Sequence, residues 1–194
     1  MILKSYEINK INQNINHLIL FYGKNEGLKN EALNNLIKDK NILKYDEKEI
    51  LDNENNFIEN ILSKSLFEQQ KSIVIRRATD KILRIIEILC LKDLEDTKII
   101  LSSDNLEKKS KLRSFFEKDK KLVCIPFYPD NDQTLSKLAY EFLRDNKISI
   151  SPSNINLIVN KCSGDRETLI KFIFEGEIEI LLSLKNLYAN LDNI

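Results

Sequence analysis

The sequence predicts an α/β fold in which a five-stranded parallel sheet flanked by helices fills residues 1–127 and a small all-helical domain fills residues 128–194. Short apolar runs alternate with segments of helical spacing up to residue 127, a pattern typical of a parallel sheet covered by helices. Beyond residue 132 the spacing is helical only. A chain of 194 residues, 42% of them hydrophobic, can bury one core and a smaller second core beside it.

Five short apolar segments are predicted as strands, because a strand covered by helices on both faces is apolar along its whole length. They are 17–22, 41–45, 71–76, 97–101 and 122–126. Segments with apolar residues at helical spacing separate them, at 26–38, 57–62, 82–89 and 112–116.

The predicted helical domain begins after a turn or linker around Pro129, where Asp and Asn residues cluster. Apolar positions from 135 to 143 then predict one helix. Ser151 and Pro152 provide an N-cap and a first helical residue for a second helix, which Gly164 ends. Asp165 begins a third.

Charge and composition exclude several classes of function. Thirty Lys and Arg residues balance thirty Asp and Glu residues, so no global field attracts nucleic acid and any DNA binding must be local. No stretch approaches the roughly 20 apolar residues that span a membrane. The first ten residues also lack the pattern of a secretion signal. A cytoplasmic location is therefore expected.

Cys90, Cys124 and Cys162 each lie in an apolar run, and an odd number of cysteines does not form a paired framework. They are predicted to be buried free thiols. Without a C-x-x-C pair and with His17 as the only histidine, the sequence offers few ligands for zinc. His17 is interpreted as a residue at the entry of the first strand, and no metal is expected.

The turn after the first predicted strand, GKNEGLKN, resembles a damaged phosphate loop. A working loop has the pattern G-x-x-x-x-G-K-[ST], in which glycines let the backbone approach phosphate and the hydroxyl holds magnesium. Leu28 replaces the second glycine, Asn30 replaces the hydroxyl, and Lys29 keeps the lysine position. The third strand ends in Arg76 and Arg77, where a metal-binding Asp and a catalytic Glu are needed. The sequence therefore predicts no ATPase activity and no cofactor.

A basic cluster lies before and within the helix at 112–116, and clustered cations can contact a phosphate backbone. The cluster consists of Lys108, Lys109, Lys111 and Arg113. The alternative is the exposed face of an amphipathic helix whose Leu and Phe residues (Leu112, Phe115 and Phe116) point inward, and this interpretation is favoured.

Leu66 and Phe67 are adjacent in the segment KSLFEQQ, just before the third strand. Neighbouring residues on a helix point about 100° apart, so both do not fit one buried stripe. One hypothesis makes them exposed anchors for a groove on a partner protein. The other makes them a cap that packs beneath the following strand, and periodicity alone does not separate the two.

Five segments, in this order, resemble the delta subunit of the bacterial DNA polymerase III clamp loader: HLILFYGKNEGL, SLFEQQKSIVIRR, LEKKSKLRSFFEK, CIPFYPDNDQTLSKLAYEFL and KCSGDRE. They extend over about residues 17–170. The resemblance implies the AAA+ fold without ATPase activity, in agreement with the damaged phosphate loop.

For function, the resemblance implies that Leu66 and Phe67 insert into an apolar pocket of the beta sliding clamp, so that one interface of the ring loosens and opens. The implied partners are this clamp, the motor subunits (gamma/tau), delta-prime and, through the assembled complex, primed DNA. Two other classes remain open, a DNA-binding module that uses the basic cluster and an adaptor with a degenerate ATPase fold.

The resemblance fades after Glu167. A delta subunit carries a third, helical collar domain through which the clamp loader assembles, and residues 174–194 are too few to form one. The chain is therefore expected to lack the collar domain.

Overall fold

The computed structural model describes residues 1–12, 15–37, 42–63, 71–92, 94 and 97–174. The chain divides into two units. The first contains Met1–Lys24 and Lys29–Phe127, and the second contains Asn25–Leu28 and the chain from Tyr128 onward. Among the described residues, no helix is long and apolar enough to cross a membrane.

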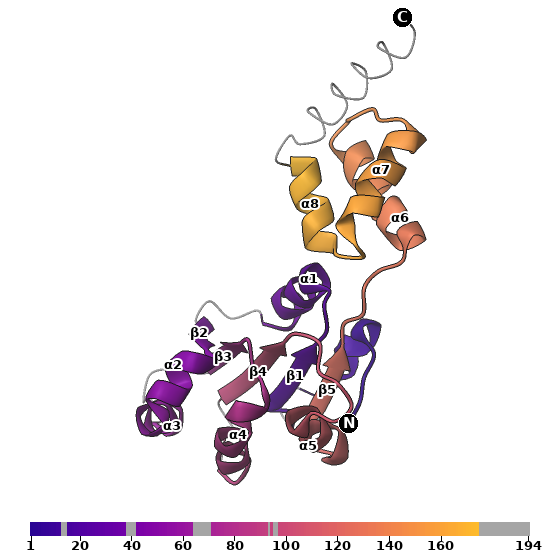
Figure 1. The fold of residues 1–194 in the computed structure, drawn as a ribbon. Coiled ribbons are helices and arrows are strands. Elements are labelled where there is room, and N and C mark those ends of the chain that lie inside the picture. Colours follow the sequence, from indigo (N-terminus) through magenta and orange to yellow (C-terminus); the bar gives the residue numbers. More distant parts are fainter. Residues whose placement is uncertain (13–14, 38–41, 64–70, 93, 95–96, 175–194) are drawn as a thin grey trace, which may run out of the picture. The chain divides into compact units, whose positions relative to one another are not determined.

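The predicted α/β fold with a five-stranded parallel sheet is confirmed in the first unit (Figure 1). The strands are β1 (Leu18–Tyr22), β2 (Ile42–Asp46), β3 (Lys71–Arg76), β4 (Thr97–Ser103) and β5 (Val123–Pro126). Their order in the sheet is β2-β3-β4-β1-β5, and all neighbours are parallel. All five residues of β1 are buried, as its apolar sequence predicts for a central strand.

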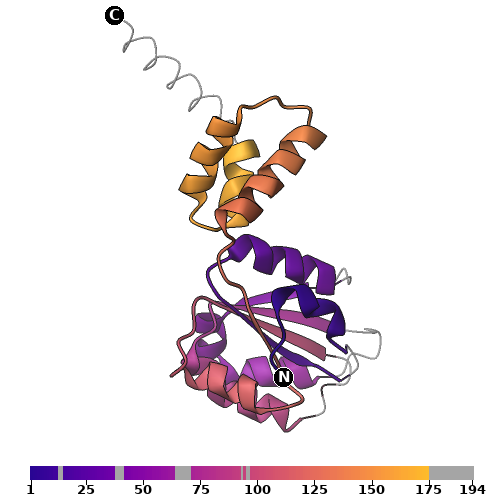
Figure 2. The same cartoon turned by 90° about the vertical axis from the view of Figure 1, so that its right-hand side faces the viewer.

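Helices cover both faces of this sheet. The α-helices of the first unit are α1 (Glu26–Leu36), whose first turn belongs to the second unit, α2 (Glu47–Asp52), α3 (Glu54–Leu62), α4 (Leu83–Cys90) and α5 (Lys111–Lys118). The described part of this unit also contains the 3-10 helices η1 (Ser5–Lys10) and η2 (Asp80–Ile82). The views in Figures 1 and 2 show α3, α4 and α5 on one face and α1 and η1 on the other. The sequence patterns did not predict α2 and η1.

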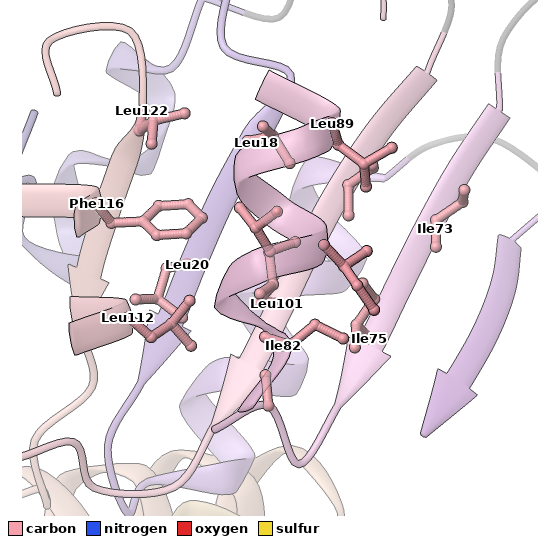
Figure 3. Packing of buried hydrophobic residues seen from close by; sticks show 14 of the residues in the cluster. Leu18, Leu20, Ile73, Ile75, Ile82, Leu89, Leu101, Leu112, Phe116 and Leu122 are labelled. Atoms are coloured by element: carbon pink, nitrogen blue, oxygen red, sulfur yellow. The ribbon is translucent and has the colours of Figure 1, made fainter. Parts of the chain in front are cut away.

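The main core lies between the sheet and the face formed by α3, α4 and α5 (Figure 3). Alternate residues of β1, Leu18 and Leu20, point toward Leu112 and Phe116 of α5, because successive side chains of a strand point to opposite faces. Burial of each such side chain contributes roughly 1.5–3 kcal/mol. On the opposite face, the rings of Phe21 and Phe127 lie 4.8 Å apart.

The second unit contains α6 (Asp132–Asp145), α7 (Pro152–Cys162) and α8 (Arg166–Phe174) around their own core. Its helix starts carry side-chain caps. The Ser151 hydroxyl accepts a hydrogen bond from the Asn154 N–H at 3.3 Å, which confirms the cap predicted for α7. Gly164, with φ of +81°, follows α7, and a Cβ there would lie 2.5 Å from Pro129. Only glycine fits this turn.

Candidate functional sites

Leu66 and Phe67, the predicted clamp-binding residues, lie outside the described residues. In the sequence they fall in the connection from α3 to β3. A hydrogen bond links α3 to the start of β3: the Lys71 ammonium donates to the main-chain oxygen of Asn60 at 2.9 Å. The anchor hypothesis and the core-packing hypothesis for these two residues both stay predictions.

The turn that resembles a phosphate loop is held by its own side chains. Asn25 is fully buried, and its side-chain oxygen accepts a hydrogen bond from the Leu28 N–H at 3.0 Å. The Asn25 amide group donates to the main-chain oxygen of Tyr128 at 3.2 Å and to the Asp130 carboxylate at 2.9 Å. Asn25 therefore caps α1 and holds its first turn to Tyr128 and Asp130, which belong to the same unit.

The Asp165 carboxylate accepts a hydrogen bond from a second N–H group of this turn. The Gly27 N–H donates to Oδ1 of Asp165 at 3.1 Å, while Oδ2 of Asp165 accepts from the Thr168 N–H at 2.9 Å. Burial acts to raise the pKa of Asp165, but the N–H groups of Thr168 and Gly27 outweigh it and hold the pKa below its usual 3.8. Asp165 thus caps the start of α8 and the first turn of α1 together.

The first residues of α8 lie very close to Gly27 within the second unit. A Cβ at this position would lie 2.3 Å from the main-chain nitrogen of Glu167 and 2.8 Å from the Cβ of Arg166. The glycine is therefore needed for contact with protein backbone, whereas the glycines of a working phosphate loop make room for phosphate.

Lys29, at the position of the phosphate-loop lysine, belongs to the core of the first unit. Its side chain is 1% exposed, and its ammonium donates to the main-chain oxygen of Ser103 at 2.8 Å. The Ser103 hydroxyl in turn donates to the main-chain oxygen of Ala78 at 2.6 Å. Lys29 therefore joins α1 to the end of β4.

The end of β3 carries cations where a magnesium site needs carboxylates. Arg77 and Arg76 lie 2.7 Å and 3.5 Å from the Asp46 carboxylate at the end of β2. Arg77 has φ of +56°, which is uncommon for a residue with a side chain. The adjacent carboxylate, Glu47, accepts hydrogen bonds from the Thr79 N–H at 2.7 Å and from its hydroxyl. Both carboxylates therefore have structural partners.

Asp80 is likewise used as a helix cap. Its carboxylate accepts hydrogen bonds from the Ser110 hydroxyl at 2.6 Å and from the N–H groups of Lys111 and Leu112 at the start of α5. Desolvation opposes these donors but is outweighed, so the pKa of Asp80 lies below its usual value. Among the residues that the structure describes, no group of His, Cys, Asp or Glu side chains could hold a metal ion.

The basic cluster separates into exposed lysines and an inward arginine. Arg113 donates to Glu117 at 2.7 Å and to the main-chain oxygen of Leu106 at 3.0 Å, and its guanidinium lies 4.8 Å from the centre of the Tyr22 ring. Lys108, Lys109 and Lys111 are exposed. Leu112 and Phe116 of the same helix are fully buried. The helix is amphipathic, as the favoured interpretation holds, but Arg113 faces inward instead of toward solvent.

The three cysteines are free. Cys124 and Cys162 are buried as predicted, whereas Cys90 is only partly buried because it lies in the last turn of α4. Burial raises the pKa of Cys124 to about 12 and the pKa values of Cys90 and Cys162 to about 11. A raised pKa lowers the fraction of thiolate, the nucleophilic form of cysteine, at neutral pH.

Comparison with known proteins gives similarity at the level of fold. No protein-family model matches the sequence, and no curated protein matches it. Solved structures do match. The DNA clamp loader delta protein of Bacillus subtilis is 14% identical with a TM-score of 0.54, over 92% of this chain and 56% of its own length. Domain III of the replication initiation protein DnaA of Thermotoga maritima is 14% identical with a TM-score of 0.54, over 89% and 81% of the two chains.

A Walker-type ATPase of Pyrococcus abyssi is 12% identical with a TM-score of 0.55, over 97% of this chain and 73% of its own length. The chain thus spans little more than half of the delta protein and a larger share of the other two. The five-stranded parallel sheet with flanking helices is the AAA+ fold that these proteins share.

Proposed function

We propose that this chain is a non-ATPase delta subunit of a bacterial clamp loader, which binds and opens the beta sliding clamp during DNA replication in the cytoplasm. The observation that carries the proposal is the position of Leu66 and Phe67. In the sequence these two residues lie shortly before β3 of the sheet, separated from it by Glu68, Gln69 and Gln70, as in the segment that resembles delta subunits. The similarity of the fold to a clamp loader delta protein supports the same assignment.

The condition of the phosphate loop supports a role without catalysis. The Gly27 N–H, which would bind phosphate in an active loop, donates to Asp165, and the Lys29 ammonium donates to Ser103. The positively charged side chains of Arg76 and Arg77 lie at the end of β3, where magnesium would need carboxylates. ATP would then act on the neighbouring motor subunits (gamma/tau), and this chain would supply the contact with the clamp.

Burial of the two apolar anchors would contribute substantially to the affinity for the clamp. Each anchor contributes roughly 1.5–3 kcal/mol when it enters an apolar pocket. Because about 1.4 kcal/mol is a factor of ten in affinity, loss of both anchors is expected to weaken binding at least a hundredfold. Contacts of this kind depend little on salt, whereas DNA binding by the exposed lysines would weaken steeply as salt rises.

The test is a calorimetric titration of the chain with the sliding clamp of the same organism. The double variant Leu66→Ala, Phe67→Ala is expected to lose binding and keep its circular dichroism spectrum. A matched control, Leu157→Ala with Tyr140→Ala, removes an aliphatic and an aromatic side chain that are 47% and 45% exposed on the second unit. This control is expected to bind like the unchanged chain.

Unchanged affinity in a folded double variant would refute the assignment. Unfolding of the double variant would favour the hypothesis that Leu66 and Phe67 are core residues. A second arm measures the melting temperature with millimolar ATP and magnesium. No change is expected, whereas a ligand present at 100 times its dissociation constant would add about 2.7 kcal/mol.

A further inference from the structure

A hollow of about 370 Å³ lies on the second unit, where the last turns of α6 meet the connection that leads to α7. We propose that this hollow is a docking site for an acidic peptide of a partner protein, in which apolar side chains alternate with carboxylates. The proposal does not depend on clamp binding.

Apolar side chains line the hollow and remain accessible. Leu143 is buried in the core of the second unit, and Ile150 packs against that core. Tyr140 and Ile148 are each 45% exposed. An aliphatic or aromatic side chain of another protein can therefore cover apolar area here, and removal of this area from water favours its binding.

The charge around these apolar side chains selects the kind of partner. Arg144 and Lys147 line the hollow, and no acidic residue of the described chain does. The Arg144 side chain is 75% exposed and donates to the neighbouring Asp145 at 3.0 Å, while Lys147 is exposed. The end of α6 carries partial negative charge and the start of α7 partial positive charge, so the two helix ends oppose each other and the cations decide. A peptide with carboxylates complements this charge.

A larger groove along α6 shows the contrast. It has a volume of about 860 Å³ and shares Tyr140 and Arg144 with the hollow, but Asp132 and Glu141 line it together with Lys137. Charges of both signs give this groove no preference for an anionic partner. The preference for carboxylates therefore belongs to the hollow at the end of α6.

The backbone of Lys147 supports a role for its side chain. Its N–H donates to the main-chain oxygen of Arg144 at 3.0 Å, and the Ile148 N–H donates to that of Leu143 at 2.8 Å. This is the pattern of a Schellman motif, in which glycine usually occupies the position of Lys147. Lys147 has φ of +59°, a conformation that a residue with a side chain adopts at a cost. A cation at a position that favours glycine agrees with a use for its charge.

The first experiment titrates a fluorescein-labelled synthetic peptide, in which leucine and phenylalanine alternate with glutamate, with the full chain and follows the anisotropy. Saturable binding that weakens as salt rises is expected, because salt screens exposed charges. One matched probe has lysine in place of glutamate, and another has serine in place of the apolar residues. Both are expected to bind about tenfold more weakly or less.

Variants of the chain test the residues. Arg144→Glu with Lys147→Glu is expected to weaken the acidic peptide about tenfold or more, because two attractions become repulsions. Lys108→Glu with Lys109→Glu makes the same change of charge at exposed positions of the first unit and is expected to leave the affinity within about twofold.

Lys147→Gly separates binding from folding. It is expected to raise the melting temperature, because glycine adopts a positive φ without strain, and to weaken the acidic peptide about threefold. A variant that is more stable and binds less tightly shows that the lysine is kept for its charge.

Any of three results would overturn the proposal: equal affinity for the acidic and the lysine-containing peptide, unchanged affinity in the folded Arg144→Glu, Lys147→Glu variant, or no saturable binding at about 1 mM of the chain. If that variant does not fold, Lys147→Gly decides in its place. Sedimentation of the full chain is expected to show no self-association through this surface. Self-association that Ile148→Ser abolishes would make a second copy the occupant and would also overturn the proposal.

Discussion

The ammonium group of Lys29 donates a hydrogen bond to the main-chain oxygen of Ser103, 74 residues further along the chain, at 2.8 Å. The lysine side chain is 1% exposed, so its ammonium group is buried next to the main-chain oxygen at the end of the central strand β4. Buried charges of this kind are kept only where hydrogen bonds compensate for lost hydration.

Lys29→Met is expected to lower the free energy of unfolding by about 1–3 kcal/mol, because it keeps the length of the side chain and leaves a buried acceptor without its donor. Urea denaturation measures the loss. The control is Lys24→Met in the exposed part of the same turn, where a change within about 0.5 kcal/mol is expected. Equal stability of the two variants would mean that Lys29 has no structural role.

Gly27→Ala is expected to destabilise the protein, although alanine favours helix over glycine by about 1 kcal/mol. The added Cβ would overlap the backbone of Glu167, and overpacking of this kind costs about 1–3 kcal/mol or more. The melting temperature should therefore fall. Asn34→Ala, at an exposed position of α1, gains helix propensity without a clash and is expected to leave the melting temperature unchanged or higher.

Acid is expected to lower the free energy of unfolding, in part because it protonates Asp165. Its pKa is lowered in the folded state, so its contribution to stability is complete above the pKa of the unfolded chain and is lost as pH falls through the folded pKa. The difference in unfolding free energy between the unchanged chain and Asp165→Asn is expected to shrink below about pH 4. Urea denaturation at pH 7 and at pH 3 measures it. A difference that stays constant would contradict the lowered pKa.

The cysteines are expected to react with Ellman's reagent much more slowly in the folded protein than after unfolding. Burial raises the pKa of Cys124 to about 12, so almost no thiolate is present at pH 8. In the folded protein Cys90 should be the fastest of the three, because it is only partly buried. In urea all three should react at similar rates. Rapid labelling of Cys124 in the folded chain would mean that β5 opens readily.

The sequence predicts the sheet well because a strand buried on both faces must be apolar at nearly every position. The five residues of β1 show this rule, and so do Ile73, Val74 and Ile75 of β3. Helix α2 follows no such rule. Its six residues bury only Glu47 and Ile50, which gives no recognisable stripe. Glu47 is held by hydrogen bonds to Thr79, a residue that no local pattern connects with it.

The candidate sites are less predictable because their contacts join distant parts of the chain. The pattern G-x-x-x-x-G-K-[ST] shows that Leu28 and Asn30 are wrong for phosphate, yet it does not show that Asp165, 138 residues from Gly27, accepts its N–H. Arg113 appears in the sequence as one of four clustered cations. Its inward direction depends on Tyr22 and Glu117, and only the fold brings these two side chains to it.

The central position of β1 also constrains the order in which the chain can acquire structure. Leu18 pairs with Ile99 of β4 and Ile19 pairs with Val123 of β5, so the first strand to be synthesised has both of its partners far downstream. At about 5–20 residues per second, a ribosome needs roughly 5–20 s to complete β5 after β1. Until β4 is available the segment LILFY has neither of its strand partners, and until β5 is available one of its edges stays open, which favours aggregation of the nascent chain.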